Sequence, residues 1–389
     1  MKTRNILIFV LLFILVAGTS GFLVYYFLLR DTGSTIPETC PDRPFTSYPV
    51  EMDKLKSITP LGNLNPPGHT FPTDHMYFNV DSTLNPEGFE VYAPGNMTLT
   101  SISKVEYDPP QGGIVEDFTI NFAVCSHLSG RFGHINNLST SILDSIDEFG
   151  EEYGDEVWEW DVAGRHYIAY NKEVNLKVHS GFLLGRSGLA GGYDFWLKDD
   201  RVVLDWVNND WTKEFQHTVC PLVYFIDPLK TVLETKVLTY GGTPTDPPGY
   251  CGKIDFDIPD TAQGIWVREG WDTRVEDNGL ALVYNNFNAS QGAISIGYAL
   301  NSSWDSRVYY FNPTNSGFMN RNFSQITNDG NIYYYLCEGF GWSGSYYKVV
   351  MIKMIGNQEL LLQVIESSSP LPNDPTPLFD ELLAVRYYR

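Results

Sequence analysis

The sequence predicts a mainly β protein preceded by one apolar helix, and three observations carry this prediction. Aromatic residues make up 14% of the 389 residues, and 24 residues are tyrosines; such flat side chains pack well on a pleated sheet. Apolar and polar residues alternate over short runs bounded by Gly, Pro and Asn, which is typical of strands with one buried face. One uncharged run near the N-terminus is far longer than a strand.

That run covers residues 6–29 and contains no charged side chain. As an α-helix it reaches about 36 Å, more than the ~30 Å hydrocarbon core of a bilayer. Lys2 and Arg4 precede it, whereas Arg30 and Asp31 follow it and cancel, so the positive-inside rule places the preceding residues in the cytoplasm. We therefore expect a single-pass anchor in the cell membrane, with the bulk of the chain extracytoplasmic.

A cleaved signal peptide is the alternative interpretation of the same run. Its apolar region would be residues 6–16, and the small residues at 17–20 would form the cleavage region. Cleavage there would leave the apolar residues 22–29 as a new terminus. The uncleaved anchor is therefore preferred.

Charge and cysteine content restrict the classes of partner. The formal net charge of −21 disfavours a nucleic-acid partner and favours solubility and cationic partners. The five cysteines show no CxxC spacing, so disulfides outside the cell are expected rather than a structural zinc site. Cys220 and Cys251 are the nearest in sequence. Because the number of cysteines is odd, at least one stays unpaired within the chain, and the pairing stays open.

Five sequons indicate a glycoprotein: Asn96, Asn137, Asn288, Asn301 and Asn322.

Beyond the apolar run, turn-rich segments divide the chain. A Pro-, Thr- and Asp-rich stalk is expected at 30–56, a first β domain at 57–240, a Gly- and Pro-rich linker at 241–252 and a second β domain at 253–389. Early strands are predicted at 91–93, 99–105 and 117–124. One short helix is predicted at 137–150, with Ser139 or Thr140 as its cap. Seven further strands predict a β-sandwich or small barrel: 265–267, 281–284, 293–298, 308–311, 331–337, 346–353 and 359–366.

Several blocks of the first β domain occur in a familiar order. Residues 68–75 place a His and an Asp close together before a strand, and residues 89–94 read Phe-Glu-Val-Tyr-Ala-Pro. Residues 118–125, 132–138 and 178–188 follow. Over residues 57–225 this order resembles the M23 (lysostaphin-type) metallopeptidases. The resemblance implies a β-sandwich or hybrid barrel, a zinc ion, and hydrolysis of peptide bonds in cell-envelope or surface polypeptides.

The resemblance also implies a set of site residues. His69 and Asp74 match the first two zinc ligands, His134 matches a catalytic histidine, and Asp205 stands where the third ligand would be. Val203 occupies the place of the other catalytic histidine. An aspartate ligand in place of a histidine would move the site toward harder divalent cations such as calcium or manganese.

Two positions compete with this set. Four residues separate His69 from Asp74 where the family usually has three, so His75 is an alternative partner, and Asp194 is a rival of Asp205. A peptidase zinc needs three protein ligands and one open position.

Two other functions stay open: an inactive module that binds a cell-surface polymer or protein partner, and a structural envelope protein.

Overall fold

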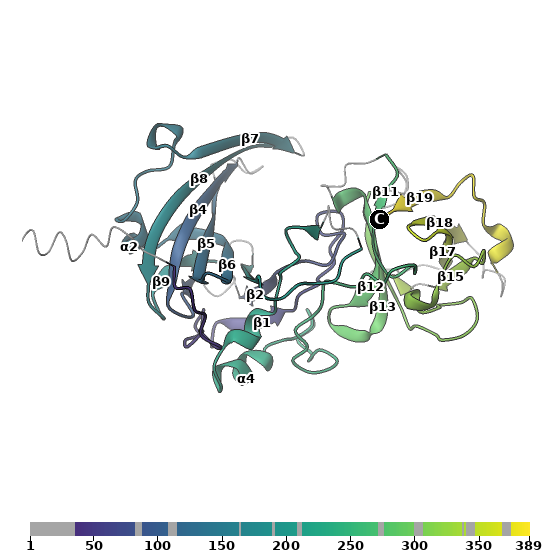
Figure 1. The fold of residues 1–389 in the computed structure, drawn as a ribbon, viewed down its shortest axis with the longest axis horizontal. Helices are drawn as coiled ribbons and strands as arrows, with labels where there is room; N and C mark the ends of the chain where they lie inside the picture. Colours follow the sequence, from purple (N-terminus) through teal and green to yellow (C-terminus); the bar gives the residue numbers. More distant parts are fainter. Residues whose placement is uncertain are drawn as a thin grey trace, which may run out of the picture. The chain divides into compact units, whose positions relative to one another are not determined.

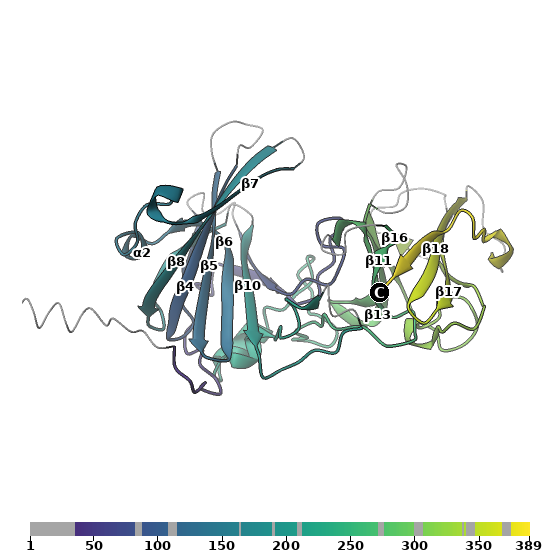
Figure 2. The same ribbon diagram turned by 45° about the horizontal axis from the view of Figure 1, so that its top comes forward.

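The described part of the chain is built from two antiparallel sheets (Figures 1 and 2). The computed structural model describes residues 36–389 except for 82–87, 108–114, 163–164, 189–190, 208–211, 271–275, 299–305, 337, 340–346 and 368–374. The apolar run at 6–29 lies outside the described residues. Among the residues described, no helix is long and apolar enough to span a membrane.

The first sheet contains ten strands, which confirms the mainly β prediction for this part of the chain. They are β1 Leu55–Thr59, β2 Met76–Val80, β3 Phe89–Tyr92, β4 Met97–Tyr107, β5 Val115–Cys125, β6 Leu128–Leu138, β7 Glu156–Val162, β8 Arg165–Val178, β9 Leu183–Ser187 and β10 Gly192–Asp199. Their order is β1-β2-β10-β6-β5-β4-β8-β7, and β9 pairs with both β3 and β6. Strands β8, β4, β5, β6 and β10 lie side by side in Figure 2.

An aromatic core covers one face of this sheet. Along β10 the residues Tyr193, Phe195 and Leu197 are buried, while the residues between them are less so. This period of two places alternate side chains on opposite faces. Phe195 is fully buried and contacts four other phenylalanine rings with centroid separations of 4.8 to 6.4 Å: Phe45, Phe78, Phe122 and Phe132. The intervening residues therefore face away from the core.

The short helices differ from the predicted one. Helix α2 covers only Thr140–Leu143, and Ser139 caps it by accepting a hydrogen bond from the backbone of Ile142 at 3.3 Å. The predicted short helix and its cap Ser139 are thus confirmed, but its extent is not: residues 137 and 138 pair with β9 as part of β6, and residues 144–150 form turns and bends. A second helix, α4 Leu229–Glu234, has Pro228 at its N-cap and was not predicted.

The second sheet contains nine strands. They are β11 Gly264–Arg268, β12 Gly279–Asn285, β13 Asn288–Ile296, β14 Arg307–Phe311, β15 Tyr333–Leu336, β16 Glu338–Gly339, β17 Tyr347–Gly356, β18 Glu359–Ser367 and β19 Val385–Tyr388. Their order is β15-β17-β18-β19-β11-β12-β13-β14-β16. The two end strands β15 and β16 are separated by a single residue, so the sheet curves toward a barrel. Each of the seven predicted segments overlaps a strand, whereas β16 and β19 were not predicted.

Two disulfides join distant parts of the chain, Cys40–Cys125 and Cys220–Cys251. The expectation of disulfides is thus confirmed, and the two cysteines nearest in sequence are paired. The remaining cysteine, Cys337, lies outside the described residues. Closing the loop between Cys220 and Cys251, 31 residues apart, removes entropy from the unfolded chain and contributes on the order of 3 to 4 kcal/mol.

A buried carboxylate at the end of β10 predicts how stability depends on pH. Asp199 accepts hydrogen bonds from Arg201 Nε at 2.8 Å and from the hydroxyl of Tyr224 at 2.7 Å. The bonds from Arg201 are the main reason that the pKa of Asp199 falls to about 2. Because the folded pKa is below the ordinary 3.8, this stabilisation is present above pH 4 and is lost as the pH falls toward 2.

We expect Asp199→Asn to lower the free energy of unfolding at pH 7 by about 1 to 2 kcal/mol, a value reduced because Arg201 is half exposed. Chemical denaturation at pH 7, 5, 4 and 3 measures the effect. The difference from the unmodified protein should shrink at acidic pH. Asp200→Asn, which changes a half-exposed neighbour, is the matched control. A constant difference across the series would contradict the assignment.

Candidate functional site

The face of the first sheet that points away from the aromatic core carries a group of polar side chains. Strand β10 lies between β2 and β6, and its Asp194 is opposite Tyr77 of β2 on one side and Gly133 of β6 on the other. Asp194 alternates with the core residues of β10, so its carboxylate lies on the outer face. The sheet order therefore places this carboxylate between β2 and β6.

A β-bulge in β6 brings a histidine to the same face. Ile120 of β5 is paired with Phe132, whereas Phe118 is paired with Ile135. One residue of β5 thus faces two of β6, and the second of these, His134, has a φ of 57°. Phe132 and Ile135 both stay in the core. The extra residue turns His134 outward, which is a common use of bulges and strained backbone at functional sites.

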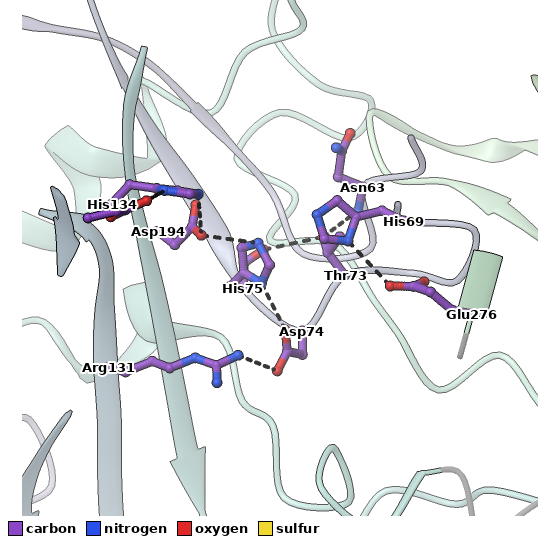
Figure 3. A network of polar contacts seen from close by, with 10 residues as sticks. Asn63, His69, Thr73, Asp74, His75, Arg131, His134, Asp194 and Glu276 are labelled. Atoms are coloured by element: carbon purple, nitrogen blue, oxygen red, sulfur yellow. Dashed lines mark hydrogen bonds and ion pairs between the residues drawn. The ribbon is translucent and has the colours of Figure 1, made fainter. Parts of the chain in front are cut away.

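Five side chains in this region form a row in which carboxylates and imidazoles alternate, and Figure 3 labels four of them: Asp74, His75, Asp194 and His134. Asp194 Oδ2 lies 3.6 Å from His75 Nε2 and 3.5 Å from His134 Nε2. His75 Nδ1 donates to Asp74 Oδ1 at 2.8 Å. At the other end, His134 Nδ1 donates to Asp117 Oδ2 at 2.7 Å. One carboxylate therefore lies between two imidazoles, and each imidazole is backed by a carboxylate of its own.

The row continues toward Arg131 and His69. The Nη2 atom of Arg131 lies 3.5 Å from Asp74 Oδ2, and the guanidinium lies 5.1 Å from the ring centroid of Trp196. His69 Nδ1 lies 3.5 Å from Glu276 Oε1. The His69 and His75 rings meet edge to face, with centroids 5.7 Å apart. Arg131 therefore belongs to the row, whereas His69 borders it through ring contact.

Charge interactions shift three groups of the site. The hydrogen bond with Asp117 raises the pKa of His134 to about 9, and the charge of Asp194 adds to the rise against the opposing effect of burial. Burial alone would raise the pKa of Asp74, but His75 and Arg131 outweigh it and lower that pKa. Burial raises the pKa of Tyr77, and the charge of Asp194 adds to it. His134 therefore carries a proton near pH 7 when no other cation faces it.

Unpartnered polar atoms mark the centre of the row. His75 is only 8% exposed, and its Nε2 atom has no hydrogen-bond partner within the described part of the chain. The same is true of the second carboxylate oxygen of Asp194, Oδ1. A buried polar atom without a partner costs about 1 to 3 kcal/mol. The arrangement therefore favours a ligand that satisfies imidazole and carboxylate together.

The donor set suits a divalent cation. Both Nδ1 atoms donate to carboxylates, which leaves Nε2 as the coordinating atom of each neutral imidazole, and ligating histidines in proteins have this same support. A tetrahedral ion with bonds of ~2.1 Å holds its donors about 3.4 Å apart, close to the separations of 3.5 and 3.6 Å around Asp194. Among the described residues no group of three His, Cys, Asp or Glu side chains is already gathered as a metal site.

The sequence-predicted residues are distributed unevenly around this row. His134 and Asp74 lie in it, Asp74 as the support of His75, and the rivals His75 and Asp194 lie at its centre. Asp205 is exposed, and in the described part of the chain no hydrogen bond or ion pair joins it to the row. The ligand set of His69, Asp74 and Asp205 stays a prediction.

Sequence reasoning missed Asp117 and Arg131. Asp117 alternates with the core residues of β5, and Arg131 precedes the core residue Phe132 on β6. This alternation was the available signal because it places both side chains on the outer face. Which outward charges meet depends on sheet order and on the bulge, and neither is visible in a single sequence.

A cavity of about 240 Å³ opens beside His75. Its lining combines apolar and charged side chains: His69, Phe71, Pro72, Thr73, Asp74, His75, Arg131, Trp206, Glu214, Phe215, Ile254, Ile265 and Glu276. It thus borders two members of the row and provides space next to the candidate cation ligands.

No protein-family model matches the chain, and no curated protein or solved structure is significantly similar to it. The function is therefore inferred from the chemistry of the site.

Proposed function

We propose that the chain is a membrane-anchored extracytoplasmic hydrolase that holds one divalent cation, zinc in the first instance, between His75, His134 and Asp194. The observation that carries this proposal is the convergence of two imidazole Nε2 atoms on one partly buried carboxylate, that of Asp194. A divalent cation between them would replace the proton that His134 carries near pH 7, and two imidazole lone pairs and one carboxylate would then face the cation. Asp74 and Asp117 support the proposal because they fix the two imidazoles through Nδ1.

The residues around the ligands suit hydrolysis. When bound, a zinc ion with three protein ligands lowers the pKa of a bound water to near 7 and polarises a carbonyl. Arg131 lies beside Asp74, the carboxylate that supports His75, and it also lines the cavity. There its guanidinium can neutralise negative charge that develops on a substrate oxygen. The aromatic core behind the strands keeps the ligand-bearing backbone in place. Each part of the set thus has a role in binding or in charge stabilisation.

Peptide-bond hydrolysis is the reaction we favour. The support for it is the resemblance of residues 57–225 to the M23 metallopeptidases, whose domains carry zinc on a β scaffold. Our ligand set differs from the one that the resemblance implies. His75 and Asp194 take the places given to His69 and Asp205, while His134 changes from catalytic residue to ligand and Asp74 from ligand to the support of His75. An extracytoplasmic polypeptide of the cell envelope or surface is the expected substrate class.

Metal content and cleavage can be measured on the same preparation. The full chain, purified in mild detergent, is loaded with zinc and dialysed, and its metal content is determined by mass spectrometry before it meets a peptide library. We expect one zinc per chain and cleavage, with both lost in His75→Ala. His127→Ala, which removes a half-exposed histidine paired with Asp200, should keep both.

The outcomes separate the proposals. A folded protein that takes up no divalent cation would contradict the proposed metal site. Zinc uptake without cleavage would favour the inactive binding module, and zinc lost only in Asp205→Asn and His69→Ala would restore the ligand set predicted from the sequence.

The packing of Gly133 against Asp194 gives a prediction for this site. A Cβ added to Gly133 would lie 3.3 Å from Asp194 Oδ2, so the carboxylate must move by a few tenths of an ångström. We expect Gly133→Ala to weaken zinc binding about tenfold, as loss of ligand support does, and to change stability by less than about 1 kcal/mol. Calorimetric zinc titration and thermal unfolding measure the two effects. Gly68→Ala, where the new methyl meets open space, is the control and should change neither.

A further inference from the structure

We infer that the cavity beside His75 binds one substrate residue that carries a positive charge at the end of an apolar stem, such as lysine. This inference deepens the proposed function and rests on it, because the cavity would then be the specificity pocket next to the cleaved bond. The volume of the cavity limits the size of its occupant. About 240 Å³ is below the ~300 Å³ at which pockets begin to hold a whole drug-sized ligand. One side chain is therefore the fitting occupant.

The walls of the cavity are largely apolar. Phe71, Ile254 and Ile265 are at most 5% exposed, and Trp206 and Phe215 are half-buried beside them. Such walls favour a methylene stem, since a long cationic side chain buries its stem along apolar surface and keeps its charged end at the rim. Trp206 adds an aromatic face, which attracts an ammonium group more strongly than other rings do.

The charges on the lining are unbalanced. Asp74 is paired with His75 and Arg131, and Glu276 accepts from the backbone of Phe71 at 2.9 Å and faces His69. Glu214 is exposed, and no hydrogen bond or ion pair is found for it in the described part of the chain. Three carboxylates thus stand against one guanidinium. A cation entering the cavity gains Glu214 as its partner, whereas an anion would have to displace Asp74 from Arg131.

Binding of small probes to the metal-free chain tests this without any catalysis. The full chain is stripped with a chelator, and the affinities of N-acetyl-lysine amide, N-acetyl-norleucine amide and N-acetyl-glutamate amide are compared by ligand-observed NMR. We expect the lysine probe to bind about fivefold more tightly than norleucine, which is the usual gain from a partly exposed ion pair, and the glutamate probe to bind most weakly.

The matched variants identify the responsible carboxylate. Glu214→Gln should remove the preference for lysine over norleucine, and Glu151→Gln, the same change at an exposed site in Glu151–Tyr153, should leave it intact. Equal binding of lysine and norleucine, a preference for glutamate, or a preference unchanged in Glu214→Gln would each overturn the inference.

Failure here and failure of the proposed function are distinguishable because zinc is absent from the binding assay. If the chain takes up zinc and cleaves peptides but binds the three probes equally, only the inference about the cavity is contradicted. If the chain prefers the lysine probe but binds no zinc, the cavity remains a binding site and the proposed hydrolase function is contradicted.

Discussion

Replacing Asp194 with asparagine is expected to weaken zinc binding by about 1,000-fold. Structural zinc sites gain about 10 to 16 kcal/mol from roughly four ligands, so one ligand accounts for about 2.5 to 4 kcal/mol, and the upper value corresponds to about three powers of ten. Asp194 also supplies the negative charge between two imidazoles, and an amide removes it. The substitution preserves the shape of the side chain and the backbone pairing with β2 and β6, so the fold should persist. Competition titration with a zinc indicator dye measures the change.

Asp205→Asn is the matched control because it makes the same change at an exposed aspartate outside the row. It should leave zinc affinity within about twofold, since surface substitutions away from a site alter little. Asp117→Asn should fall between the two, with a loss of 10- to 100-fold typical of a residue that supports a ligand. If Asp205→Asn were the damaging change and Asp194→Asn the silent one, the row on the outer face would not be the metal site.

The fold was predictable where the signal is local. Alternation along β5 reports directly which side chains meet the core, and each predicted strand of the second sheet overlaps an observed one. The helix at 137–150 was over-extended because an apolar spacing of three and four also occurs where a strand ends and a turn begins. Residues 137 and 138 are held in β6 by their pairing with β9, a partner almost 50 residues away in sequence.

The candidate site was predictable only in part for the same reason. His75 and Asp194 are separated by more than 100 residues and meet because β2 and β10 are neighbours. Spacing within a motif favoured His69, which is near His75 in sequence but lies at the edge of the cavity with Glu276. The direction of His134 depends on a bulge that inserts one residue. Sheet order and bulges are set by tertiary packing, and no single-sequence pattern reports them.

Truncating Phe195 to alanine is expected to lower the free energy of unfolding by about 3 to 5 kcal/mol, the range for a phenylalanine removed from a close-packed core. Its ring is fully buried and stacks on that of Phe132, with centroids 4.8 Å apart, so truncation removes ring contacts and leaves a cavity in the core. Equilibrium denaturation with urea measures the loss. Phe318→Ala, at a residue 47% exposed, is the control and should cost less than about 1 kcal/mol.

The same variant tests the assignment of faces on which the site depends. Phe195 and Asp194 are consecutive residues of β10, so their side chains must point to opposite faces. Phe195→Ala should therefore lower stability while the molecules that remain folded keep nearly full zinc affinity. A Phe195→Ala protein as stable as the unmodified chain would mean that this face is not the core. The outward row of His75, Asp194 and His134 would then lose the scaffold that holds it.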